Sequence, residues 1–129
     1  LERAIFSDKT HRKPYRFFAM TITTETTASA TIVSIEGQIN SANATAMEAQ
    51  VQAIIDGGAR GLVFDFSALD YISSAGLRMV LVVAKRLKGE GGQLVLSGMQ
   101  PHVREVFDIS GFLAILNVEP TRAEALARF

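Results

Sequence analysis

The sequence predicts a single small α/β domain with a mostly parallel central sheet of four to five strands and about four helices. Three observations support this fold class. The 129 residues suit one domain with one core. A hydrophobic share of 48% and a charged share of 20% are typical of a globular chain rather than a disordered one. From Thr31 onward, short β-branched runs alternate with segments of helical periodicity, which is typical of parallel strands joined by helices.

The alternation begins with one strand and one helix. A β-branched run from Thr31 predicts a strand that stops at Gly37. Residues 41–56 place apolar side chains at helical spacing, with Ser41 in the N-cap position. The glycine pair at 57–58 is expected to end this helix.

The middle of the chain continues the same pattern. Residues 62–66 form a nearly continuous apolar run, as expected for a strand that is covered on both faces. Residues 75–88 carry one apolar stripe and predict a second helix, which the glycine-rich stretch 89–92 ends. Residues 93–97 predict the next strand.

The C-terminal part predicts two more helices around a short strand. Pro101 suits the first turn of a third helix, which breaks at Gly111. A last strand is expected over residues 114–118, and Thr121 is placed to cap a terminal helix.

The N-terminal segment differs from the rest of the chain. Residues 1–19 show no sustained period, and Pro14 would break a helix. Their net charge is +3, whereas the remainder carries −3. We expect Met20 to be the natural start, with residues 1–19 a disordered or appended segment and residues 20–129 the domain. The alternatives are a native arm that docks on the body, and a basic tail that contacts an acidic surface.

Composition excludes several classes of function. The absence of cysteine excludes disulfides, thiolate metal sites and a cysteine nucleophile. His11 and His102 are far apart and lack metal-ligand spacing, so no metal and no cofactor are expected. The mildly acidic body is a poor binder of nucleic acid. No apolar run reaches the length of a membrane span and no secretory signal is present, so we expect a cytoplasmic protein without membrane insertion.

Two serines mark a strand-to-helix turn at the edge of the sheet where ligand sites gather. Residues 65–77 read DFSALDYISSAGL, so that Ser73 or Ser74 lies where a helix begins. A hydroxyl there can cap free backbone N–H groups. A phosphate there would meet the positive end of the helix dipole. Both uses remain open at this point.

Four motifs in order carry a family resemblance. They are GQIN at 37–40, DFS at 65–67, SSAGL at 73–77, and VREVF at 103–107 followed by SGF at 110–112. With them, the chain resembles the STAS domain family, and within it the bacterial anti-sigma factor antagonists, over about residues 22–127.

This resemblance implies a non-enzymatic protein that binds an anti-sigma factor, itself a serine kinase, and so releases a sigma factor to RNA polymerase. The family's phosphorylated serine lies two residues before the glycine and corresponds to Ser74, whose phosphorylation would break the contact. A phosphatase would be a second partner, and the chain would be a monomer or weak dimer. The residues expected on the partner-binding surface are Asn40, Ser41, Ser73, Ala75, Gly76 and Arg78.

Two positions depart from the family pattern and leave alternatives open. Ser73 replaces the aspartate that precedes the modified serine, and Asn40 replaces a frequent aspartate. Ser73 is therefore an alternative site of modification. The alternative function is a STAS scaffold or accessory subunit, stressosome-like or associated with a lipid transporter, without phosphorylation control.

Enzymatic and nucleotide-binding functions find little support in the motifs. The G-x-S-x-G elbow is absent, and His102, the nearest candidate base, is expected to be exposed in the first turn of a helix. No phosphate-binding glycine motif is present. Gly76 suits either close packing or a partner contact, and Met79 is expected in the core.

Overall fold

The sheet is mixed, and four of its six strand pairs are parallel. The structure is a computed structural model and describes residues 13–129. The seven strands are β1 (Lys13–Phe17), β2 (Met20–Thr26), β3 (Thr31–Ile39), β4 (Gly61–Asp65), β5 (Leu69–Ile72), β6 (Gln93–Ser97) and β7 (Asn117–Glu119). Their order is β1-β2-β3-β4-β6-β7, and β5 pairs with the end of β3. Only the β1–β2 and β2–β3 pairs are antiparallel.

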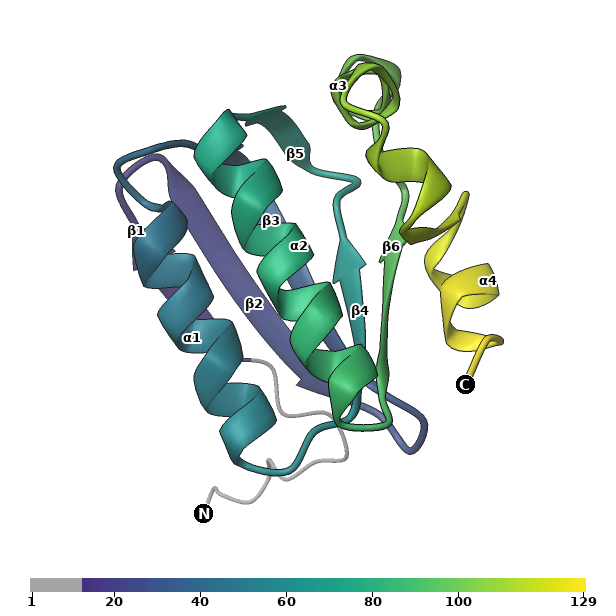
Figure 1. The fold of residues 1–129 in the computed structure, drawn as a ribbon. Coiled ribbons are helices and arrows are strands. Elements are labelled where there is room, and N and C mark those ends of the chain that lie inside the picture. The colour runs from purple at the N-terminus through teal and green to yellow at the C-terminus, as the bar shows by residue number, and fades with distance from the viewer. Residues whose placement is uncertain (1–12) are drawn as a thin grey trace.

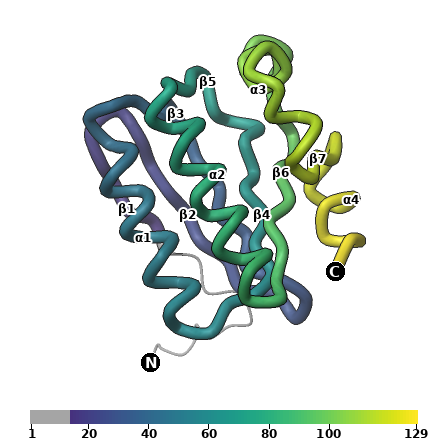
Figure 2. The backbone as a smooth tube through the Cα atoms, viewed as in Figure 1, coloured from purple at the N-terminus to yellow at the C-terminus, as the bar shows by residue number. Residues whose placement is uncertain are grey.

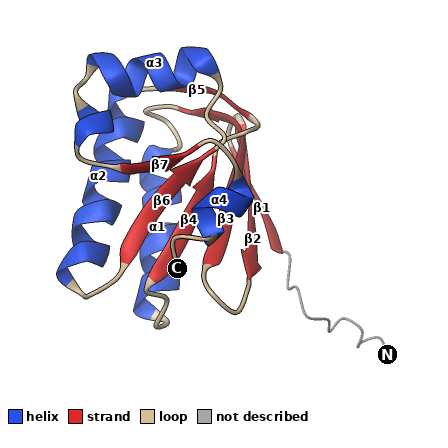
Figure 3. Cartoon of the chain, turned by 90° about the vertical axis from the view of Figure 1, so that its right-hand side faces the viewer, coloured by secondary structure: helices blue, strands red, loops and turns tan. Residues whose placement is uncertain are grey.

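Helices lie on both faces of this sheet. They are α1 (Ala44–Asp56), α2 (Ser74–Gly89), α3 (Pro101–Ile109) and α4 (Arg122–Leu126), together with the 3₁₀ turn η2 (Phe112–Ala114). Figure 1 shows α1 and α2 side by side over one face, and Figure 3 shows α4 on the other. The chain trace in Figure 2 follows β6 through α3 to β7, the strand at one end of the sheet order. These features confirm the predicted α/β domain with its mostly parallel sheet and four helices.

Side-chain alternation in β3 explains the two layers. Val33 and Ile35 belong to the main core beneath α1 and α2, whereas Ile32 belongs to a smaller cluster with Ala125 of α4. Successive residues of a strand point to opposite faces, so β3 contributes to both clusters. The main core contains a row of aromatic rings, with 5.8 Å between the centroids of Phe64 and Phe66 and 6.3 Å between those of Phe66 and Phe107.

The structure has more strands than the four to five predicted. Strand β2 alternates buried Met20 and Ile22 with threonines, and β5 has only four residues. Neither contains the continuous apolar run that identified the other strands. Both still pair along their length with β3, the strand that organises this half of the sheet.

Strand β1 corrects the prediction of a disordered segment up to residue 19. Residues 13–17 pair with β2, while Tyr15 and Phe17 pack against the main core. Pro14 is tolerated because β1 is the first strand in the sheet order, where one side of the backbone has no neighbouring strand among residues 13–129. The prediction for residues 1–12 lies outside the described residues.

Two boundaries also differ from prediction. The N-cap of α1 is Asn43 rather than Ser41, so the helix begins at Ala44. The last strand covers 117–119 rather than 114–118, because the chain after α3 first makes the turn η2. The predicted Thr121 cap is confirmed, since its hydroxyl accepts a hydrogen bond of 3.1 Å from the backbone N–H of Glu124.

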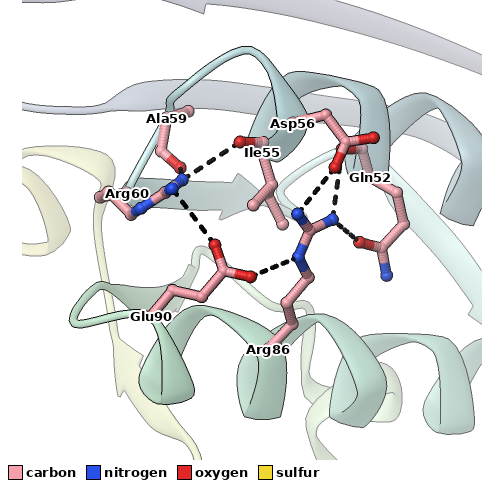
Figure 4. Close-up of polar contacts among 7 residues, drawn as sticks. All are labelled: Gln52, Ile55, Asp56, Ala59, Arg60, Arg86 and Glu90. Atoms are coloured by element: carbon pink, nitrogen blue, oxygen red, sulfur yellow. Dashed lines mark hydrogen bonds and ion pairs between the residues drawn. The ribbon is translucent and has the colours of Figure 1, made fainter.

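Charged side chains join the C-terminal ends of α1 and α2 (Figure 4). Arg86 of α2 contacts the carboxylate of Asp56 at 2.7 Å and that of Glu90 at 2.9 Å. Glu90 in turn contacts Arg60 at 3.2 Å. The hydrogen bonds that Arg86 donates to Glu90 and Asp56 raise the pKa of its guanidinium, which therefore stays charged. The network lies at the opposite end of α2 from Ser74.

No helix within residues 13–129 is both long and apolar enough to cross a membrane.

Candidate functional site

The two serines of the turn have different surroundings. Ser73 is the N-cap of α2 and is half-buried. Its Oγ accepts a hydrogen bond of 3.2 Å from the backbone N–H of Gly76, and its own N–H donates to the carbonyl of Ile39 at 2.8 Å. Ser74 is the first residue of the helix and is exposed. Ser73 therefore caps the helix, whereas Ser74 is the serine exposed to solvent.

The first turn of α2 presents positive potential. The N–H groups that begin a helix have no intrahelical acceptor, and together they carry about half a positive charge. Within the described chain, this turn has no acidic side chain. Arg78 is exposed and lies four residues after Ser74, which places both on one face of the helix. A phosphate on Ser74 would therefore meet helix N–H groups and one cationic side chain.

A loop from Asn40 to Asn43 lies beside this helix start. The Oδ1 of Asn40 accepts hydrogen bonds from the N–H groups of Ala42 at 2.9 Å and Asn43 at 3.1 Å. Asn40 therefore shapes the loop, a task that needs only an acceptor oxygen and that an aspartate could also perform. Ser41 is exposed on the loop.

Asn43 is a structural residue that the sequence did not single out. It is 1% exposed. Its Nδ2 donates to the carbonyls of Phe18 at 2.6 Å and Gln38 at 2.9 Å, while its Oδ1 accepts from the N–H of Asn40 at 2.9 Å. The only local signal is an asparagine next to a predicted helix start. Its partner Phe18 is 25 residues away and belongs to a turn that the sequence did not predict.

Gly76 has a packing role. A Cβ built on it would lie 2.7 Å from Ile39 Cγ2 and 2.7 Å from Ile72 Cγ1, which is too close. Gly76 is therefore the contact that lets α2 approach β3 and β5. Gly76 is buried, so it cannot itself contact a partner as the predicted partner-binding surface would require. Met79 is 2% exposed, which confirms its place in the core.

The structure brings most of the predicted surface residues to one edge of the sheet. This edge consists of the end of β3, the loop 40–43, the end of β5 and the first turn of α2, all at the upper rim in Figure 1. We call it the Ser74 edge. Ser74, Ser41 and Arg78 are exposed there, whereas Asn40, Ser73 and Ala75 are half-buried.

His102 has a structural contact rather than a catalytic one. It is exposed in the first turn of α3, as predicted, and its Nε2 lies 2.6 Å from the backbone carbonyl of Asp70. Gln100 Nε2 donates to the carbonyl of Leu69 at 3.0 Å. These contacts hold the start of α3 against β5. Residues 13–129 contain no cluster of three or more His, Asp or Glu side chains that could bind a metal ion.

Asp65, in the DFS motif, holds α4 against the sheet. It is buried and accepts hydrogen bonds from Arg122 at 2.8 and 3.1 Å and from the N–H of Ser67 at 3.0 Å. Burial alone would raise the pKa of Asp65, but the Ser67 N–H and the Arg122 guanidinium together lower it below its ordinary value. Arg122 also donates to Ser34 Oγ at 3.0 Å. This cluster joins the C-terminal helix to β3 and β4.

Comparison with known proteins gives consistent results. The family model for the STAS domain matches residues 21–125. The Bordetella bronchiseptica protein BtrV, described as an anti-sigma factor antagonist, is 54% identical over 98 residues, which cover 76% of this chain and 84% of BtrV.

Solved structures show the same fold. An anti-sigma factor antagonist from Mycobacterium paratuberculosis superimposes with a TM-score of 0.78 at 25% identity, covering 84% of this chain and 92% of that one. Unphosphorylated SpoIIAA gives 0.72 at 24% identity, covering 83% and 94%. Phosphorylated SpoIIAA from Bacillus gives 0.62 at 21% identity, covering 92% and 98%.

Proposed function

Because this chain belongs to the STAS domain family, we propose that it is an anti-sigma factor antagonist controlled by phosphorylation of Ser74. In its unphosphorylated form it binds a serine-kinase anti-sigma factor, which then releases its sigma factor. Phosphorylation ends this contact, and a phosphatase restores it. The family assignment also supports the prediction of a non-enzymatic regulatory protein. We place this exchange in the cytoplasm, where RNA polymerase works.

The observation that carries the proposal is the division of roles between Ser73 and Ser74. Ser73 Oγ holds the N–H of Gly76, so modification there would remove the cap of α2. Ser74 is exposed at the first helical position. In the reaction, the kinase moves the γ-phosphoryl group of ATP to Ser74 Oγ, ADP leaves, and a base on the kinase takes the hydroxyl proton. The product suits a helix start, where backbone N–H groups favour an anion.

The added charge explains how the contact would end. A phosphoserine carries about −1.5 to −2 charges at neutral pH. Removing that charge from water costs several kcal/mol, and one exposed side chain such as Arg78 offsets only a small part of this cost. The fold itself need not change, because the phosphate lies on an exposed residue. The switch would therefore work at the surface of the protein.

Labelling with purified serine-kinase anti-sigma factors tests the proposal. We expect wild-type protein to accept label from γ-labelled ATP and Ser74→Ala to accept none. Ser73→Ala is the matched control: it should still be labelled, while losing about 1 kcal/mol of stability through the missing cap. Label that persists in Ser74→Ala would overturn the assignment to Ser74. Binding without any label would favour the scaffold or transporter-associated function instead.

A further inference from the structure

We propose that Phe18 and Tyr71 are the apolar anchors through which the Ser74 edge holds the anti-sigma factor. This inference rests on the proposed function and names residues that neither the motifs nor the predicted surface include. Phe18 lies in the turn between β1 and β2, and Tyr71 lies in β5.

Both side chains are exposed to an unusual degree for large aromatic residues. Phe18 is 74% exposed and Tyr71 is 50% exposed. Six large hydrophobic side chains within residues 13–129 are exposed, and three of these are aromatic. Of these three, Tyr71 lies on the Ser74 edge and Phe18 lies next to it, in the β1–β2 turn. Aromatic side chains are enriched in the buried centre of protein interfaces, and tyrosine is among the residues that most often dominate the binding energy.

Backbone contacts place the two aromatic residues on either side of Gln38. The N–H of Gln38 donates to the carbonyl of Ala19, next to Phe18, at 2.9 Å. On its other side, Gln38 is the pairing partner of Tyr71 in the parallel β3–β5 ladder. Tyr71 precedes Ser74 by three residues. The two aromatic residues therefore flank the end of β3 and continue the Ser74 edge toward the β1–β2 turn.

The turn that carries Phe18 is fixed more firmly than a surface turn requires. Asn43 binds the Phe18 carbonyl from a site that is 1% exposed. Ala19 has a φ of 61°, in the left-handed region that side chains other than glycine rarely adopt. A Cβ on Gly37 would lie 2.4 Å from the Ala19 carbonyl, so glycine is needed for the turn to dock. Backbone strain of this kind is concentrated at functional sites.

A rigid turn also makes the aromatic anchor more effective. A backbone segment that is already held in place loses little conformational freedom when a partner binds. The occupant is the serine-kinase anti-sigma factor itself, because the aromatic pair is continuous with the edge that presents Ser74 to that enzyme. A phosphate three residues after Tyr71 would then lie at the margin of an apolar contact, where a charge is least tolerated.

Alanine substitution of each aromatic residue tests the anchors. The probe is the purified serine-kinase anti-sigma factor that binds wild-type protein, with the dissociation constant measured by isothermal titration calorimetry. We expect Phe18→Ala and Tyr71→Ala each to weaken binding at least tenfold and to raise the KM for Ser74 phosphorylation. Ile115→Ala is the matched control, since Ile115 is 67% exposed and lies beside Gly92 and Gln93, where β6 begins. It should change binding less than twofold.

Two further measurements keep the outcomes separate. Tyr71→Phe preserves the ring and should bind like wild type, and thermal melts of all variants should match wild type because the side chains are exposed. If wild type binds and is labelled at Ser74 while both alanine variants bind within twofold of it, the anchors are wrong and the proposed function stands. If wild type binds no such kinase, both proposals are overturned.

Discussion

Asn43 makes three hydrogen bonds from a site that water does not reach. Replacing it by alanine leaves the carbonyls of Phe18 and Gln38 and the N–H of Asn40 without this partner. An unsatisfied buried polar group costs about 1–3 kcal/mol. We therefore expect Asn43→Ala to lower the free energy of unfolding by about 3 kcal/mol in urea titrations. Ser41→Ala, on the same loop but exposed, should stay within about 0.5 kcal/mol of wild type.

Gly76 offers a second test at the level of one residue. A methyl group would clash with Ile39 and Ile72, and overpacking costs about 1–3 kcal/mol. The better helix propensity of alanine, about 1 kcal/mol, offsets only part of this cost. We therefore expect Gly76→Ala to lower the melting temperature.

Gly89 is the matched glycine, because a Cβ there meets nothing within 4 Å and the residue ends the same helix. Gly89→Ala should leave the melting temperature unchanged or raise it. If Gly76→Ala raised the melting temperature as Gly89→Ala does, helix propensity, rather than packing against β3 and β5, would govern position 76.

At the scale of the element, α2 combines the proposed phosphorylation site with a cationic side chain. Phosphoserine at 74 and Arg78 are four residues apart on one helix, and such pairs contribute about 0.5 kcal/mol. We expect phosphorylated wild type to melt at the same temperature as the unmodified protein or slightly higher, and phosphorylated Arg78→Ala to lose that gain. A large drop in melting temperature on phosphorylation would show that the switch acts by unfolding α2.

The elements that the sequence predicted share one property. Strands β3, β4 and β6 have apolar runs that bury residues in the core, and α1, α2 and α3 have apolar stripes, so a local window contains the signal. Strands β1, β2 and β5 lack such runs. They are strands because β3 pairs with β2 and β5, and β2 with β1, which is information from distant parts of the chain.

The candidate site was predictable to the same extent. Ser73 and Ser74 were placed correctly at a helix start because a cap is a local feature. The N-cap of α1 was not placed correctly, because the position of Asn43 depends on a hydrogen bond to the distant carbonyl of Phe18. Burial of Gly76 also depends on Ile39, which follows from the packing of α2 on β3.

At the scale of the whole molecule, the Asp65–Arg122 pair connects the C-terminal helix to the sheet and makes stability depend on pH. The pKa of Asp65 is lowered in the folded protein, so its contribution is complete above the unfolded value near pH 4. It is lost as the pH falls through the lower, folded-state pKa. At pH 7, Asp65→Asn should be less stable than wild type by about 1–2 kcal/mol.

Urea titrations between pH 3 and 8 measure this difference. It should be constant above about pH 5 and shrink as Asp65 becomes protonated in both states. Asp108→Asn changes an exposed carboxylate on α3 and should show no comparable loss at any pH. If the difference in free energy of unfolding between wild type and Asp65→Asn stays constant down to pH 3, the packing of the Asp65 side chain, and not its charge, stabilises the protein.

The length of α2 separates two kinds of chemistry. Ser74 and the ion pairs of Arg86 lie at opposite ends of the helix, and the fifteen-residue rise from Ser74 to Gly89 is about 22 Å. The sequence contains no cysteine. A single Lys88→Cys substitution would therefore give a unique thiol on a rigid helix, remote from Ser74. A fluorophore attached there would report binding and release of a labelled partner by energy transfer, without occupying the proposed partner surface.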